Sequence, residues 1–219
     1  DFTTNFSFKK SVAPLLKKHG VDLVTLANNH TFDKGADSYV NTRSVLENAG
    51  LQVFGHPREL NEQSYKVVEL NSQEFLFVGF NEAVSSFFNA EDAINFVQQL
   101  NEKFPDHIMI INIHWGTEYA TTSNEMQQKL AHAFVDNGAD LIVGHHPHVV
   151  QESEIYNNKY IYYSLGNYIF DQYFSEETQT GLVIKAIFDK EKNVKIEEVP
   201  IKVNRSQPID HNSSTLNSL

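Results

Sequence analysis

Three short polar clusters rich in histidine contain the residues of this sequence that could do chemistry. They are Asn29-His30, His114 and His145-His146-Pro147-His148. The sequence has ten His and no Cys, so a metal site in it must be built from imidazole, amide and carboxylate ligands. Neutral imidazoles and a carboxamide oxygen suit Zn, Mn, Fe or Ni. The residue types therefore predict a metal centre without thiolate ligands.

Each cluster taken alone also has an ordinary structural explanation. A single His after a strand, such as His114, is more often a hydrogen-bonded loop residue than a ligand, and Asn28-Asn29 is a turn signal. In the third cluster, Pro147 favours an extended backbone at His146, which presets the relation between its ring and that of His148. The hypothesis of one shared metal site depends on the combination of the three clusters.

The elements before the clusters explain why their side chains should meet. Residues 21–27 (VDLVTLA), 108–113 (IMIINI) and 140–143 (DLIV) are strand-like and lead into the three clusters. The continuous apolar run of 108–113 indicates a strand that is buried on both faces. In open α/β sheets, ligands bind at the carboxyl ends of the strands, because the loops there converge on one crevice. We therefore expect the three clusters at one edge of a sheet.

Helical patterns alternate with these strands. A helix before Gly20 is predicted with apolar positions Phe8, Val12, Leu15 and Leu16, and a helix over 36–49 with inward Tyr39, Val40, Val45 and Leu46. The spacing of apolar residues over 94–104 predicts a third helix. A capping box of Thr122 and Glu125 predicts the start of a fourth, which ends at Gly138.

The second half of the sequence is rich in predicted strands. A hairpin is expected over 65–80, and further strands over 149–156, 160–165, 181–188 and 194–203. The Ser- and Asn-rich end, residues 206–219, is predicted to be a disordered tail. We find no repeat or linker, so residues 1–205 are expected to form one α/β domain.

Composition excludes several functional classes. The 219 residues carry 17 Lys and Arg against 28 Asp and Glu, a net charge of −11, which argues against nucleic acid and against an anionic membrane surface as partners. With 12% aromatic residues, the chain is unlike a disordered one. No apolar run approaches the ~20 residues of a membrane span.

Four motifs together resemble a known family. They cover residues 26–35 (LANNHTFDKG), 114–119 (HWGTEY), 138–151 (GADLIVGHHPHVVQ) and 163–171 (YSLGNYIFD). The set is similar to the bacterial capsule synthesis protein CapA/PgsA family, which serves poly-γ-glutamate capsule synthesis and belongs to the calcineurin-like metallophosphoesterase superfamily. The motifs occur in the family's order within residues 6–173.

The resemblance implies a four-layer α/β/β/α sandwich of metallophosphoesterase type, with a metal centre at one edge. It implies the metal ligands Asn29, His114, His146 and His148 and the catalytic residue His30. Two divalent ions are implied, one held by Asn29, His114 and His146 and the second by His148, with Mn, Zn and Fe all open. His145 would lie outside the coordination sphere.

Two acidic and two aromatic residues near the clusters have open roles. Asp33 and Glu118 are expected to orient the ligand imidazoles without binding the metal themselves; as isolated acids, they would be solvated loop carboxylates. Trp115 and Tyr119 suit packing and a substrate platform equally well.

The sequence departs from the family's pattern at its start. Family members begin with a strand that carries a Gly-Asp motif, followed by an Asn-Leu-Glu motif, and the acidic ligands of these motifs have no counterpart here. We therefore expect an N-terminally truncated domain that lacks its first strands. Weak metal affinity and little turnover are expected from such a chain.

Two functional hypotheses of different classes follow from the resemblance. The first is a capsule biosynthesis protein with a metal-dependent, phosphoesterase-like hydrolase site, acting on a phosphoester or on poly-γ-glutamate. The alternative is a non-catalytic binding or scaffold component of a capsule polymer synthesis and export complex, in which any metal is structural.

Partners and location are implied by the resemblance alone. It implies poly-γ-glutamate or another anionic polymer as ligand, a membrane-bound synthesis complex as partner, and a cell-surface location through an anchor in the missing N-terminal segment, with a cytoplasmic location as the alternative. A net charge of −11 would repel a polyanion unless the cleft carries metal or local Lys and Arg.

Overall fold

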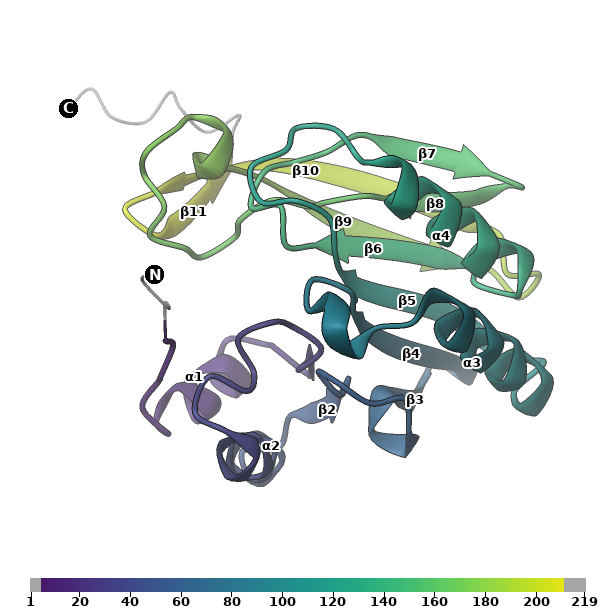
Figure 1. The fold of residues 1–219 in the computed structure, drawn as a ribbon, viewed down its shortest axis with the longest axis horizontal. Coiled ribbons are helices and arrows are strands. Elements are labelled where there is room, and N and C mark those ends of the chain that lie inside the picture. The colour runs from purple at the N-terminus through teal and green to yellow at the C-terminus, as the bar shows by residue number, and fades with distance from the viewer. Residues whose placement is uncertain (1–4, 211–219) are drawn as a thin grey trace.

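A six-stranded sheet forms the centre of the computed structural model, which describes residues 5–210 (Figure 1). Its strand order is β3-β4-β5-β6-β8-β7. The strands are β3 (Tyr65–Leu70), β4 (Gln73–Asn81), β5 (Ile108–His114), β6 (Leu141–His145), β7 (Ser153–Tyr156) and β8 (Lys159–Tyr162). The four inner strands run parallel, and β3 and β7 pair antiparallel at the edges. The parallel core places four carboxyl ends along one edge of the sheet.

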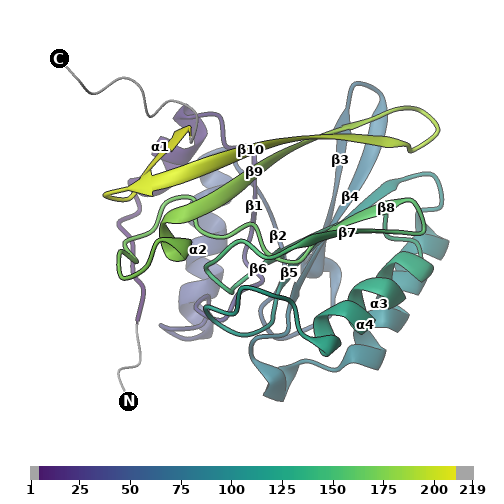
Figure 2. The same cartoon turned by 90° about the horizontal axis from the view of Figure 1, so that it is seen from above.

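Two helices, α3 (Ala90–Lys103) and α4 (Glu125–Asp136), cover one face of this sheet (Figure 2). Met109, Ile111 and Ile113 of β5 point into the core beneath these helices, whereas Ile108 and Ile110 point to the opposite face. The prediction of a strand buried on both faces is confirmed, because helices pack on one side of β5 and a second layer of strands on the other.

The second layer of strands contains two separate groups. β9 (Thr180–Phe188), β10 (Val194–Asn204) and β11 (Gln207–Asp210) form one antiparallel sheet, and β1 (Leu23–Thr25) pairs parallel with β2 (Gln52–Phe54). Leu182 and Ile184 of β9 pack on the central sheet beside Phe77. The ring of Phe54 in β2 lies 5.9 Å from that of Phe77. Both groups therefore cover the same face.

Two further helices, α1 (Val12–Lys18) and α2 (Ala36–Asn48), complete the layers (Figure 1). Tyr39 and Leu46 of α2 pack on Val24 and Val53 of the short parallel pair. The order is helix, sheet, strand layer, helix, as predicted for the α/β/β/α class. Single-turn helices lie at Glu62–Ser64, Ser85–Phe87 and Glu177–Gln179.

Three side chains of the apolar patterns that predicted these helices are exposed, among them Val40, which was predicted to be inward, and Phe8, which lies before the start of α1. Val40 is 63% exposed, Phe8 77% and Leu15 51%. Because β1 and β2 have only three residues each, they offer a narrow apolar surface, on which α2 buries Tyr39 alone. Within the described range, no helix is both long and apolar enough to cross a bilayer.

The start of α4 differs from the prediction by two residues. The capping box is formed by Asn124 and Gln127, not by Thr122 and Glu125. Both pairs have the required spacing, so local sequence does not distinguish them. Gln127 is buried, and its Nε2 donates to Gln151 at 3.1 Å, which fixes the helix start through a tertiary contact.

The predicted disordered tail contains a strand. Gln207–Asp210 forms β11 and pairs with residues 201–204 of β10. Arg205 and Ser206, with φ of 49° and 62°, make the turn between the two strands. The rest of the predicted tail, residues 211–219, lies outside the described residues.

Candidate metal centre

The carboxyl edge of the central sheet brings the three histidine clusters together. β5 ends at His114 and β6 ends at His145, and these two residues are register partners. β1 ends at Thr25 in the second strand layer, and the chain then runs through Asn29 and His30. The site therefore lies where both β layers end.

Distances between the side chains are those of groups that can face a common cation. His114 Nε2 and Asn29 Oδ1 lie 3.0 Å apart, which is about the spacing of two neighbouring ligands that each lie ~2.1 Å from one metal ion. The ring centroids of His114 and His146 are 4.6 Å apart, and those of His146 and His148 are 6.1 Å apart. Four of the predicted site residues thus form one group.

A carboxylate joins this group from the loop after β5. Glu118, His146 and His148 each offer one ligand atom, and these atoms lie within 4.8 Å of one another. Glu118 Oε1 is 3.9 Å from His148 Nε2. Glu118 is predicted above to orient imidazoles, whereas its position among the donor atoms suits a ligand. The arrangement is compatible with use of a metal.

Burial keeps the central imidazoles neutral. The pKa of His114 is lowered well below its usual value, first by burial and then by the neighbouring histidines. Burial also lowers the pKa of His146, although Glu118 opposes this shift, and lowers the pKa of His145 to about 4. Neutral imidazoles are the form that binds metal, so at neutral pH these side chains would not have to release a proton before binding a metal ion.

The backbone of the third cluster is strained. The φ of His146 is 102° and that of His148 is 60°. The extended conformation predicted for His146 from the following proline is therefore wrong. The loop is held by a tertiary contact, because the backbone N–H of Tyr119 donates to the Pro147 carbonyl at 2.8 Å. Strain of this kind is typical of functional sites.

The donor set fits a divalent cation. His146 Nδ1 is buried and has no hydrogen-bond partner among the described residues, although a buried imidazole nitrogen normally has one. Two or three neutral imidazoles, an amide oxygen and one carboxylate are ligands that Zn, Mn and Fe accept. A bound cation would satisfy the unpaired nitrogen.

His30 lies beside this group and is held by an acid. Its Nδ1 is 3.0 Å from Asp33 Oδ2, and its backbone N–H donates to Asn28 Oδ1 at 2.9 Å. The backbone N–H of Phe6 also donates to Asp33 Oδ2 at 2.9 Å. Asp33 thus orients His30, which leaves His30 Nε2 as the ring nitrogen available to a substrate.

Sequence reasoning missed Asn167, which orients His148. Asn167 Oδ1 lies 2.9 Å from His148 Nδ1, and Asn167 Nδ2 donates to the Thr178 carbonyl at 2.9 Å. The second bond fixes the orientation of the amide, so Asn167 Oδ1 accepts a hydrogen bond from Nδ1 of His148. In the neutral ring, Nε2 of His148 then carries no proton and can bind a metal ion. Asn167 lies within the motif at 163–171, and this was its only signal in the sequence.

The two aromatic residues with open roles differ in their environment. Trp115 is 0% exposed, and its Nε1 donates to the Tyr163 carbonyl at 2.8 Å, so it packs in the core. Tyr119 is 42% exposed, and its ring centroid lies 6.0 Å from that of His148. Tyr119 therefore borders the site at the surface.

Comparison with known proteins gives consistent matches. The profile of the family described as "Bacterial capsule synthesis protein PGA_cap" matches residues 1–172. The chain is 30% identical to the "PGA biosynthesis protein CapA" of Bacillus subtilis, with 91% of this chain and 55% of that protein covered. It is 29% identical to the "Capsule biosynthesis protein CapA" of Bacillus anthracis, with 95% and 54% covered. The chain thus spans about half the length of these relatives.

There are also two more distant matches, one to a sequence and one to a solved structure. A "Probable polyglutamine synthesis accessory protein" of Mycobacterium tuberculosis is 28% identical, with 67% of this chain and 44% of that protein covered. The crystal structure of a hypothetical protein from Thermus thermophilus superposes with a TM-score of 0.65 at 18% identity, with 89% of this chain and 82% of that chain covered. At this identity, the structural match concerns the fold alone.

Proposed function

Because this chain belongs to the bacterial capsule synthesis protein PGA_cap family, we propose that it serves poly-γ-glutamate capsule synthesis through a metal-dependent, phosphoesterase-like hydrolase centre. The observation that carries the proposal is the group formed at the carboxyl edge by His114, His146 and His148, together with Asn29 and Glu118. The strained backbone at His146 and its unpaired Nδ1 both destabilise the fold. Such features are typical of functional sites and unusual in loops with a structural role alone.

In this proposal, the chain's own residues divide into metal ligands and a substrate-facing residue, His30, with Asp33 behind it. Asn29, His114 and His146 would hold one divalent ion, with His148 and Glu118 toward a second, and Mn, Zn and Fe all suit the donor set. Bound there, a divalent cation lowers the pKa of water and so supplies hydroxide near neutral pH.

His30 has a separate role in this proposal. Asp33 accepts from its Nδ1 and keeps the ring in place, and in the imidazolium form, in which both ring nitrogens carry a proton, Nε2 would donate that proton to the charge that develops on the leaving group. Phe6 packs edge-on against the His30 ring, with centroids 4.6 Å apart, and this contact limits the access of water to that side of the ring.

Substitution of two ligands tests the proposal. In the full-length protein, His146→Ala and Asn29→Ala should abolish uptake of Mn or Zn, measured by calorimetry, and lower hydrolysis and polymer output. His19→Ala, at an exposed His outside the site, is the matched control and should change neither. Undiminished polymer output from both ligand variants would contradict the hydrolase and favour the scaffold alternative. Undiminished metal uptake would contradict the site itself.

The names of three relatives support a proposal about the setting of this activity. These relatives are named for the synthesis of PGA, of a capsule or of polyglutamine, and we infer that the chain works beside a membrane-bound synthesis complex, on the outer side of the cell. Protease added to intact cells should cleave the full-length protein if this location is right. Full protection until the cells are lysed would place the protein in the cytoplasm.

A further inference from the structure

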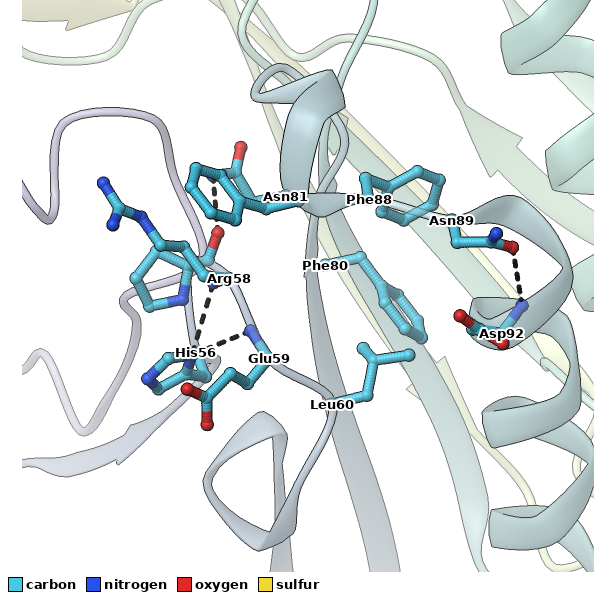
Figure 3. A pocket seen from close by; sticks show the side chains of 11 residues that line it. His56, Arg58, Glu59, Leu60, Phe80, Asn81, Phe88, Asn89 and Asp92 are labelled. Atoms are coloured by element: carbon cyan, nitrogen blue, oxygen red, sulfur yellow. Dashed lines mark hydrogen bonds between the residues drawn. The ribbon is translucent and has the colours of Figure 1, made fainter.

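A pocket of about 270 Å³ lies at the ends of β2 and β4 (Figure 3). One wall is the segment 56–60 that follows β2, and the opposite wall includes Phe88 and Asp92 near the start of α3. Phe80 and Asn81, at the end of β4, form its back. The pocket therefore opens at the carboxyl edge of the sheet, where the candidate metal centre also lies.

Two contacts place the pocket next to that centre. Asn81 of the pocket is the register partner of His114, the last residue of the neighbouring strand. The guanidinium of Arg58 lies 4.5 Å from the ring centroid of Phe32, and Phe32 follows His30 by two residues. One wall of the pocket is thus in contact with the loop that carries His30.

Arg58 is held in a position that leaves its hydrogen-bond donors available. Phe32 and Phe87 contact its guanidinium at 4.5 and 4.4 Å. The backbone N–H of Arg58 donates to His56 Nδ1 at 3.2 Å. Over residues 5–210, no carboxylate pairs with the guanidinium. Because stacking engages the faces of this planar group, its N–H edges remain free for a carboxylate.

The rest of the pocket offers acceptors. Asn81 is 5% exposed; its Nδ2 donates to the Pro57 carbonyl at 3.0 Å, and its buried Oδ1 has no partner in the described part of the chain. Glu59 and Asp92 add two carboxylates to the lining. A simple anion would be repelled by these acids, whereas a ligand that carries a carboxylate beside an N–H donor matches both parts.

We propose that this pocket binds one γ-glutamyl unit of the polymer, with its α-carboxylate on Arg58 and its amide N–H facing the acceptors. The identity of the polymer rests on the proposed function; the requirement for a carboxylate beside an N–H comes from the pocket. Arg58 also supplies the local cation that a chain of net charge −11 needs to hold a polyanion near its centre.

Binding by the metal-free chain tests the pocket separately from the metal centre. After removal of metal with EDTA, anisotropy of a fluorescent γ-glutamyl oligomer should show saturable binding. Arg58→Gln should weaken this binding by about tenfold to a hundredfold, since a charge-assisted bidentate pair is lost. Arg58→Lys should fall in between, because it keeps the charge and loses the planar fork. Arg205→Gln, at an exposed Arg in the β10–β11 turn, is the matched control and should bind as the unchanged chain.

Three results would overturn the proposal: no binding of the oligomer by the metal-free chain, equal affinity of Arg58→Gln and the unchanged chain, or equally tight binding of polyphosphate, which lacks N–H donors. A titration of each variant with Mn is done in parallel. Arg58→Gln should take up Mn normally. Failure of the unchanged chain to bind Mn would count against the proposed hydrolase centre, while the oligomer result would still decide the pocket.

Discussion

The bond between Asn167 and His148 gives the sharpest quantitative prediction. Substitution Asn167→Leu keeps a similar volume and removes the acceptor that lies 2.9 Å from His148 Nδ1. Loss of such an orienting partner typically weakens metal binding about tenfold to a hundredfold, or roughly 1.4–2.7 kcal/mol. Because Asn167 is 7% exposed, water cannot readily replace the missing oxygen, so we expect the effect to be fully developed.

The same substitution also removes a donor and destabilises the fold. The Thr178 carbonyl, which accepts from Asn167 Nδ2 at 2.9 Å, is left unpaired at a cost of about 1–3 kcal/mol. Stability is measured by urea unfolding of the metal-free chain, and affinity by calorimetric titration with Mn or Zn. Measured at a urea-free, fully folded condition, affinity reports on His148 alone.

Asn167→Asp separates orientation from stability. It keeps an oxygen for His148 Nδ1 and loses the donor to Thr178, so stability should fall while metal affinity stays within a few fold of normal. Gln172→Ala removes a 3.2 Å contact to Asn167 and the 3.0 Å bond from Gln172 Nε2 to the Tyr119 hydroxyl; neither contact involves His148, so this control should leave affinity unchanged. Normal metal affinity in Asn167→Leu, or equal loss in the Leu and Asp variants, would refute the orienting role.

Further predictions concern packing, capping and pH. In Gly144→Ala the new Cβ would collide with the Tyr163 carbonyl oxygen, so the free energy of unfolding in urea should drop by about 3 kcal/mol; a drop smaller than about 1 kcal/mol would show that the strands separate easily. Asn124→Ala should lower the free energy of unfolding, measured by thermal denaturation, by about 1 kcal/mol, and Thr122→Ala should hardly change it. A larger loss in Thr122→Ala than in Asn124→Ala would instead support the cap predicted from the sequence. Burial lowers the pKa of His145 from 6.5 to about 4, so between these two pH values the unfolded chain binds a proton at His145 and the native chain does not. Stability should therefore be complete above pH 6.5 and fall as the pH drops toward 4; equal urea midpoints at neutral pH and at a pH between these two values would contradict this.

Local patterns in the sequence predicted much of the fold. The apolar run before His114 predicted a strand buried on both faces, and the structure confirms it. The hairpin predicted over 65–80 is also present as β3 and β4. Predictions failed where a choice depended on distant neighbours: Val40 has the right helical spacing, yet the short strands beneath α2 leave it 63% exposed.

The sequence by itself determined which residue types follow each strand. Because parallel strands end at one carboxyl edge of the sheet and the chain has no Cys, a site at that edge is limited to His, Asn and carboxylate ligands. Only the tertiary structure decided how these groups meet. The φ of 102° at His146, the placement of Glu118 among the imidazoles and the bond from Asn167 to His148 join residues from separate loops. Such contacts arise from packing between layers, and no local spacing rule encodes them.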